Sequence, residues 1–235
     1  MDSQVIVALD FDSHRAAGEL VARLGDACGA YKVGLELLTA AGPGLVRELV
    51  ARGHEVFLDL KLFEIPDSVA GAVRSAGALG ASMVTVHAMG GTGIMAAAVE
   101  AAREFPRLKV LALTVVTSMT SGDLADVGIA SSTDEQVLRL ARLAARAGCD
   151  GVVAAPREAA ALRTLLGPQP LIVTPGVTLP GETQRGPRGG EVRAGTPWAA
   201  LADGASHVVV GRSVTRAPDP VAALRRIAAG GQPCG

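Results

Sequence analysis

Aromatic residues are scarce in this sequence, at 3% of 235 residues, and neither sign of charge dominates it. Its 22 basic and 23 acidic residues leave a formal net charge of -1. Proteins that bind a phosphate backbone usually carry a clustered basic excess, and proteins that bind single strands stack the bases on aromatic rings. The composition therefore predicts that nucleic acid is not a partner of this protein.

Long apolar runs and paired cysteines are also missing. No apolar run approaches the length of about 18 to 20 residues that a membrane span needs, and the opening MDSQVIVALD lacks the regions of a signal peptide. Cys28, Cys149 and Cys234 are odd in number and share no C-x-x-C spacing, so neither a disulfide framework nor a zinc site is indicated. We expect a soluble, cytoplasmic protein that does not associate with a membrane.

What the sequence does contain is one repeating pattern, in which short β-branched runs alternate with stretches of helical period. The helical stretches include residues 14–28, 42–53, 67–80 and 134–148, and many of them end in glycine, as helices often do. The eight predicted strands are 5–10, 31–34, 55–60, 83–88, 109–117, 151–154, 171–176 and 207–212.

This alternation predicts an α/β protein with a parallel sheet that is covered by helices. At this length we expect a single (β/α)8 TIM barrel domain over residues 1–235, with a loose tail from about residue 230. An open doubly wound sheet is the alternative, but the first strand-to-helix turn, ALDFDSHR, lacks the glycine-rich dinucleotide fingerprint. The connections 117–133 and 177–196 are long, and long loops in a compact domain are often functional.

Charged residues stand near the ends of the first three predicted strands. Asp10 ends the first strand, Lys32 lies on the second, and Asp59 and Lys61 lie on the third. Catalytic groups of such barrels sit at the carboxyl ends of the strands, and buried charges are tolerated only when they are paired. We interpret the four residues as a network that holds one ammonium over a substrate; ordinary ion pairs at a barrel rim are the alternative.

The loops after the last two predicted strands point to phosphate, because barrel enzymes often bind phosphate there. These loops begin TPGV and VGRSVT. Gly211 allows close approach of the backbone, and Arg212 can grip a phosphate with its planar guanidinium. Elsewhere, His87 fits a structural role at least as well as a catalytic one, and Thr117 fits either a substrate contact or a strand cap.

A family resemblance adds to these observations. The motifs VALD, YKVG, FLDLKLFEIP, VTVHAMGG, LTVVTSM, GCDGVV, VTPG and VVVGRSVT, in this order over nearly the whole chain, resemble the bacterial orotidine 5'-phosphate decarboxylase family. The resemblance implies decarboxylation of orotidine 5'-phosphate to UMP in pyrimidine synthesis, with no metal or organic cofactor. It also implies a homodimer with the active site at the subunit interface.

The resemblance further implies roles for single residues. Lys61 would be the proton donor, Asp59 the carboxylate beside the departing group, and Lys32 a member of their network. The substrate-binding residues that it implies are Asp10, Lys32, Asp59, Ile65, Ser68, Thr117, Pro175, Gly211 and Arg212.

One departure from the family pattern concerns the subunit interface. The family carries D-x-K-x-x-D, and its last Asp reaches the site of the neighbouring subunit, whereas this chain has Glu64 there. We expect Glu64 to take that catalytic position, with one additional methylene.

Two further departures fall in the loop 177–196, which is expected to grip the phosphate. The family continues TPG with Ile-Arg, whereas this chain has Val177 and Thr178, and Glu191 stands where the family has a glutamine that bridges phosphate and base. Our hypothesis is that one of three arginines in the loop replaces the missing one. They are Arg185, Arg188 and Arg193.

Two other interpretations remain open. A keto-sugar-phosphate decarboxylase of the same superfamily would need magnesium, but such relatives carry a glutamate ligand where this chain has Lys32. A divergent paralogue that binds a nucleotide or sugar phosphate without this activity would explain the departures. It would not explain why Asp10, Lys32, Asp59 and Lys61 are all present.

Overall fold

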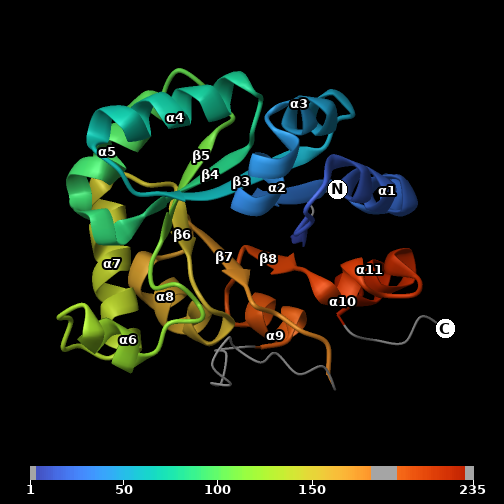
Figure 1. Ribbon diagram of the computed structural model, residues 1–235. Coiled ribbons are helices and arrows are strands. Elements are labelled where there is room, and N and C mark those ends of the chain that lie inside the picture. The colour runs from blue at the N-terminus through green and yellow to red at the C-terminus, as the bar shows by residue number, and fades with distance from the viewer. Residues whose placement is uncertain (1–3, 181–194, 231–235) are drawn as a thin grey trace.

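The computed structural model describes residues 4–180 and 195–230. Its eight strands are parallel and form a closed barrel in which each strand pairs with its neighbours in sequence and β8 pairs with β1 (Figure 1). The predicted (β/α)8 barrel is confirmed. The strands are β1 (Val5–Ala8), β2 (Ala30–Gly34), β3 (Glu55–Leu62), β4 (Met83–His87), β5 (Lys109–Leu113), β6 (Gly151–Val153), β7 (Leu171–Pro175) and β8 (His207–Val210).

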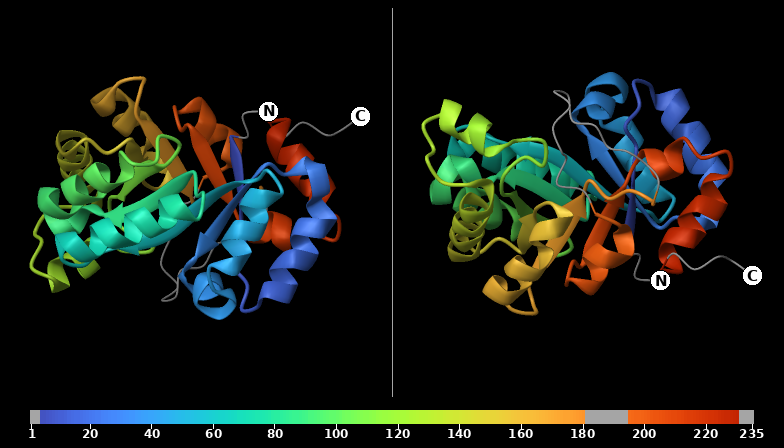
Figure 2. Two further views of the ribbon diagram at one scale, coloured as in Figure 1. Left: turned by 90° about the horizontal axis from the view of Figure 1, so that it is seen from above. Right: turned by 90° about the horizontal axis from the view of Figure 1, so that it is seen from below.

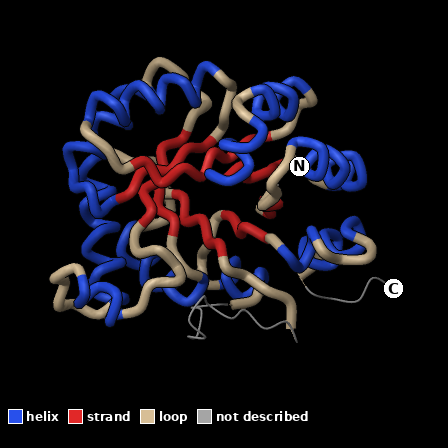
Figure 3. Tube along the Cα trace, in the orientation of Figure 1, coloured by secondary structure: helices blue, strands red, loops and turns tan. Residues whose placement is uncertain are grey.

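Helices surround the strands on the outside of the barrel (Figure 3). Views from above and below show the same arrangement, with α1 (His14–Leu24) and α11 (Pro220–Ala228) side by side (Figure 2). The other α-helices are α2 (Leu35–Ala41), α3 (Gly44–Ala51), α4 (Pro66–Ala78), α5 (Gly91–Ala102), α6 (Ser121–Asp126), α7 (Thr133–Ala147), α8 (Ala159–Leu166), α9 (Pro197–Ala202) and α10 (Arg212–Thr215). Short 3-10 turns are η1 (Gly25–Ala27), η2 (Ala88–Gly90) and η3 (Pro156–Glu158). Within the described residues, no helix is both long and apolar enough to span a membrane.

The longest helix, α7, shows how the sequence sets the boundaries of an element. The Ser132 side chain accepts a hydrogen bond from the Glu135 N–H, and the Glu135 carboxylate accepts one from the Ser132 N–H, which forms a capping box. At the other end, Gly148 has a φ of 84°, a left-handed conformation that suits glycine and ends the helix.

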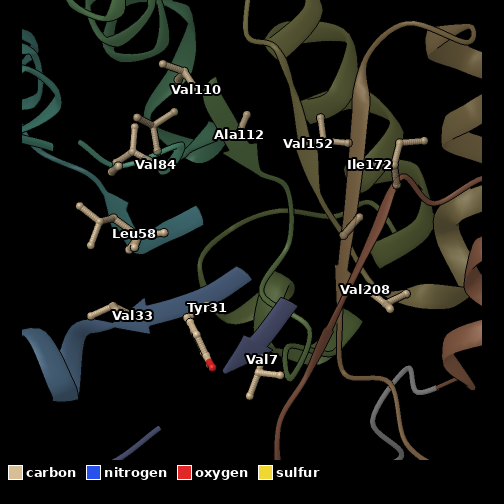
Figure 4. Close-up of a cluster of buried hydrophobic side chains, with 14 of the residues drawn as sticks. Val7, Tyr31, Val33, Leu58, Val84, Val110, Ala112, Val152, Ile172 and Val208 are labelled. Carbon is tan, nitrogen blue, oxygen red and sulfur yellow. The ribbon is translucent and has the colours of Figure 1, made fainter. Parts of the chain in front are cut away.

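The strands have two apolar faces. Residues on one face pack with helix residues, and Figure 4 shows several of them, including Val33, Leu58 and Val84. The second cluster contains only strand residues, among them Phe57 and Leu111, so it fills the interior of the barrel. This interior cluster forms the floor beneath the charged residues at the carboxyl ends of the strands.

Most predicted strand ends differ from the structure by one or two residues, and the end of β5 differs by four. β1 ends at Ala8 rather than 10, so Asp10 lies just beyond the strand, and β3 continues to Leu62 rather than ending at 60. β5 ends at Leu113 rather than 117, and β8 ends at Val210 rather than 212, because Arg212 already begins α10. The connection 117–133 was expected to be a long loop, but it contains α6, whose first turn is held by a capping box between Thr120 and Asp123. The extent of the domain and the tail from about residue 230 stay predictions.

Candidate active site

Four charged side chains meet at the carboxyl ends of β1, β2 and β3. Lys32 Nζ donates a hydrogen bond of 2.9 Å to Asp10 Oδ1 and lies 4.0 Å from Asp59 Oδ2. Lys61 Nζ donates a hydrogen bond of 2.7 Å to the same Oδ2 atom of Asp59. The charges therefore alternate along a continuous chain from Asp10 through Lys32 and Asp59 to Lys61, so the structure brings these four predicted residues together.

The four groups differ in exposure. The side chains of Lys32 and Asp59 are 10% and 11% exposed, whereas Lys61 is 34% exposed and Asp10 is 64% exposed. A buried charge is tolerated when an opposite charge compensates it, and each of the two buried groups has such partners. Lys61 is thus the ammonium that is both fixed by a carboxylate and accessible to a molecule in the barrel mouth.

The backbone of β3 is irregular where it presents this pair. Leu58 aligns with Val84 of β4 and Leu62 aligns with Val86, so three residues of β3 oppose one residue of β4. Lys61, in this bulge, has a φ of 50°, a left-handed conformation that costs a non-glycine residue about 1–2 kcal/mol. Bulges next to active sites re-aim side chains, and this one directs Lys61 toward Asp59.

Thr85, the β4 residue opposite the bulge, is a site residue that the sequence interpretation missed. It is fully buried, and its hydroxyl lies within hydrogen-bond distance of both Asp59 and Lys61. The available signal was a polar residue in the middle of the apolar run MVTVHA, two positions before His87 and therefore on the same face of the strand.

His87 lies at the end of β4 and is half-buried. Its Nδ1 atom accepts a hydrogen bond of 3.2 Å from the Met89 N–H, which assigns the proton of the neutral ring to Nε2. Burial lowers the pKa of His87, and the positive charge of Lys61 lowers it further. The imidazole is therefore neutral near pH 7, and its hydrogen bond fits the structural role.

A cavity of about 1270 Å³ adjoins the charged chain. It lies at the ends of β1, β7 and β8 and beside α10 and α11. Its lining includes six predicted residues, namely Asp10, Lys32, Pro175, Thr178, Gly211 and Arg212. Arg216 and Arg226 also line it, and the sequence interpretation missed both. Arg212, Arg216 and Arg226 all come from α10, its C-terminal end and α11, and arginines that line a cavity make it suitable for an anionic group such as a phosphate.

The residues just before and just after the long loop are held together beside this cavity. Gly176, directly after β7, has a φ of 83° that favours glycine. Val177 then forms a bridge with Gly195, and Thr178 N–H donates a hydrogen bond of 3.0 Å to the Gly195 carbonyl. Four predicted loop residues lie outside the described residues; they are Arg185, Arg188, Glu191 and Arg193.

Four other predicted residues are not among the described residues that line this cavity. They are Glu64, Ile65, Ser68 and Thr117. Glu64 is exposed, and hydrogen bonds from the Ser68 side chain and the Ile65 backbone lower the pKa of its carboxyl group. Ile65 is 62% exposed, and Thr117 is half-buried beyond the end of β5. Among the described residues, no contact joins Ile65 or Thr117 to the Asp59 and Lys61 pair.

The closed barrel, the lysine–carboxylate chain and the arginine-lined cavity together define a barrel enzyme with a preorganised cationic centre. Residues 3–227 match the model of the orotidine 5'-phosphate decarboxylase / HUMPS family. The chain belongs to this family, and it is an enzyme of the carboxy-lyase class.

Similar proteins agree with this assignment. An orotidine 5'-phosphate decarboxylase of Moorella thermoacetica is 48% identical over 233 residues, which cover 96% of this chain and 91% of that protein. An orotidine 5'-phosphate decarboxylase of Anaeromyxobacter sp. (strain K) is 47% identical over 227 residues, which cover 97% of this chain and 97% of that protein. The crystal structure of orotidine 5'-phosphate decarboxylase from Lactobacillus acidophilus matches with a TM-score of 0.85 and 34% identity, covering 97% of this chain and 99% of that one.

Proposed function

We propose that the chain decarboxylates orotidine 5'-phosphate to UMP in de novo pyrimidine synthesis, in the cytoplasm and without a metal or organic cofactor. The observation that carries the proposal is the Asp10, Lys32, Asp59 and Lys61 chain, which adjoins an arginine-lined cavity. Relatives that carry the name of this activity cover nearly the whole chain.

The chemistry requires charge stabilisation at one ring carbon. As the bond between that carbon and the carboxylate breaks, carbon dioxide leaves and the electron pair stays on the ring as a carbanion with little resonance stabilisation. A fixed ammonium stabilises this developing charge and then donates a proton to the carbon. Lys61 is the group proposed for this role, and its neutral amine regains a proton from solvent.

Asp59 has two roles in the proposal. Its carboxylate fixes the Lys61 ammonium at 2.7 Å, so the cation needs little reorganisation during the reaction. The same carboxylate would stand beside the carboxylate of the substrate, and the repulsion between them is relieved when carbon dioxide departs. Lys32 compensates the charge of Asp59, and Asp10 binds the ribose.

The phosphate would lie in the cavity against Gly211 and Arg212. We expect Arg212→Ala to raise KM by about 10- to 100-fold, since one charge-assisted interaction contributes about 1.5–3 kcal/mol. Arg225→Ala is the matched control, because Arg225 is exposed on α11 but is not among the residues that line the cavity. Steady-state kinetics of both variants measure the difference, and equal KM values would place the phosphate elsewhere.

A separate question is which arginine takes the place of the phosphate-binding arginine that the family has where this chain has Thr178. Arg185, Arg188 and Arg193 remain candidates by sequence, and Arg216 and Arg226 are added because they line the cavity. Single alanine variants, each assayed for KM, identify it as the one position besides Arg212 where KM rises sharply.

A homodimer is the proposed assembly. Leu35, Phe63 and Ile65 are 57%, 60% and 62% exposed, and they lie just after β2 and β3, beside the charged chain. A second copy that covers them would bury apolar surface and bring Glu64 toward the neighbouring site. We expect Ile65→Asp to sediment as a monomer. The control is Val127→Asp, which should remain dimeric; Val127 is 65% exposed and caps the C-terminal end of α6. A monomeric unmodified protein would contradict the assembly.

The direct test of the proposed function adds the purified chain to orotidine 5'-phosphate in a chelator, follows the loss of orotate absorbance and identifies the product. The proposal predicts UMP at a rate that the chelator does not change. Activity that depends on magnesium would favour the keto-sugar-phosphate relatives. An inert protein that still binds UMP would favour the binding paralogue.

A further inference from the structure

We propose that Thr85 is a positioning residue for the reaction, because its hydroxyl joins the Asp59 carboxylate to the Lys61 backbone. Lys61 N–H donates a hydrogen bond of 2.8 Å to Thr85 Oγ1, and Thr85 Oγ1 donates one of 3.0 Å to Asp59 Oδ1. The ring closes through the bond from Lys61 Nζ to Asp59 Oδ2. The inference rests on the proposed function, in which Lys61 is the proton donor.

The hydroxyl is well suited to this task because it acts both as a hydrogen-bond acceptor and as a hydrogen-bond donor. It accepts from an amide and donates to a carboxylate, and Thr85 is 0% exposed, so water does not compete for either bond. The β-branched side chain has restricted χ1 freedom, which holds the oxygen in place. Thr85 thereby fixes the orientation of one carboxylate oxygen of Asp59 and leaves the other for Lys61.

The second effect of Thr85 is on the backbone. Lys61 has a φ of 50° in the bulge of β3, where the register of β3 against β4 skips it, and its N–H donates its hydrogen bond to the Thr85 hydroxyl. A valine at position 85 would leave that N–H and one Asp59 oxygen without their bonds. The Lys61 backbone and the Asp59 carboxylate would then each lose one bond that helps to aim the ammonium, and a misplacement of about 1 Å costs about 100-fold in rate.

The test compares Thr85→Val, which removes the hydroxyl at constant shape, with Thr85→Ser, which keeps it. We expect kcat of Thr85→Val to fall by about 100-fold, with the Kd for UMP changed by less than about threefold because the binding groups remain. Thr85→Ser should keep most of the activity. Thr85→Ala serves in place of valine if the valine variant does not fold.

The matched control is Thr114→Val. Thr114 is also 0% exposed, and its hydroxyl donates a hydrogen bond of 3.0 Å to the Val153 carbonyl, which is not a group of the charged chain. A merely structural role predicts equal losses of kcat at positions 85 and 114, and that result would overturn the inference. Full activity of Thr85→Val would also overturn it.

A double-mutant cycle separates positioning from general damage. If Thr85 acts through Asp59, then Thr85→Val should cost much less in kcat when Asp59 is already asparagine. Additive losses would count against the inference. An unmodified protein that does not convert orotidine 5'-phosphate would overturn the proposed function itself, whereas an active protein with an unaffected Thr85→Val variant overturns only the role of Thr85.

Discussion

Lys61→Ala is expected to lower kcat by at least about 10⁴-fold, because it removes both the proton donor and the cation that stabilises the carbanion. Binding should suffer much less, since the phosphate and ribose contacts lie on other strands. We therefore expect the Kd for UMP to stay within about tenfold of that of the unmodified protein. Single-turnover kinetics and calorimetric titration with UMP measure the two effects separately.

The matched control for this variant is Lys109→Ala, which removes a lysine outside the charged chain. Lys109 lies at the start of β5 and pairs with Asp150 at 3.1 Å, with 47% of its side chain exposed. Its loss should leave kcat unchanged. A Lys61→Ala enzyme that keeps more than about a tenth of the rate would show that another group supplies the proton.

Asp59→Asn should have the second largest effect. Asparagine keeps the shape but loses the charge that lies 2.7 Å from Lys61 and 4.0 Å from Lys32. We expect kcat to fall by about 10³-fold as the ammonium of Lys61 loses its anchor. The free energy of unfolding should fall by about 3 kcal/mol, because the buried Lys32 is left with only the exposed Asp10.

Asp134→Asn controls for the loss of a carboxylate that is ion-paired but exposed. Asp134 pairs with Arg157 at 2.7 Å and is 68% exposed, so its removal should cost less than about 1 kcal/mol and no activity. Urea denaturation and steady-state assays of both variants give the comparison. Equal destabilisation of the two would mean that the charged chain does not behave as a buried network.

Much of the fold could be predicted from the sequence because each strand is a short apolar run and each helix has its own period. The positions of Asp10, Lys32 and Asp59 then followed, since the carboxyl ends of parallel strands meet at one mouth. The end of β5 was placed too late because Thr114, Val115 and Val116 continue the β-branched pattern after the pairing with β6 has ended.

What the sequence did not reveal depends on contacts between strands. The bulge at Lys61 is set by the register of β3 against β4, and Thr85 becomes important only because that bulge places an amide and a carboxylate opposite it. Arg216 and Arg226 reach the cavity through the packing of α10 and α11, which no local pattern encodes.

The most direct test of the role of Lys61 restores an ammonium at position 61 by chemical modification. Lys61→Cys is alkylated with 2-bromoethylamine, which rebuilds a lysine-like side chain. Burial raises the pKa of Cys28 and raises that of Cys149 to about 12, so both thiols should react slowly. The unmodified protein, treated in the same way, controls for alkylation at those cysteines and at Cys234.

We expect Lys61→Cys to be inactive and alkylation to return a large part of the turnover of orotidine 5'-phosphate. Mass spectrometry of the peptide that contains residue 61 shows how much of it has reacted. Complete alkylation with no return of activity, or a cysteine variant that is active before alkylation, would contradict the role of Lys61.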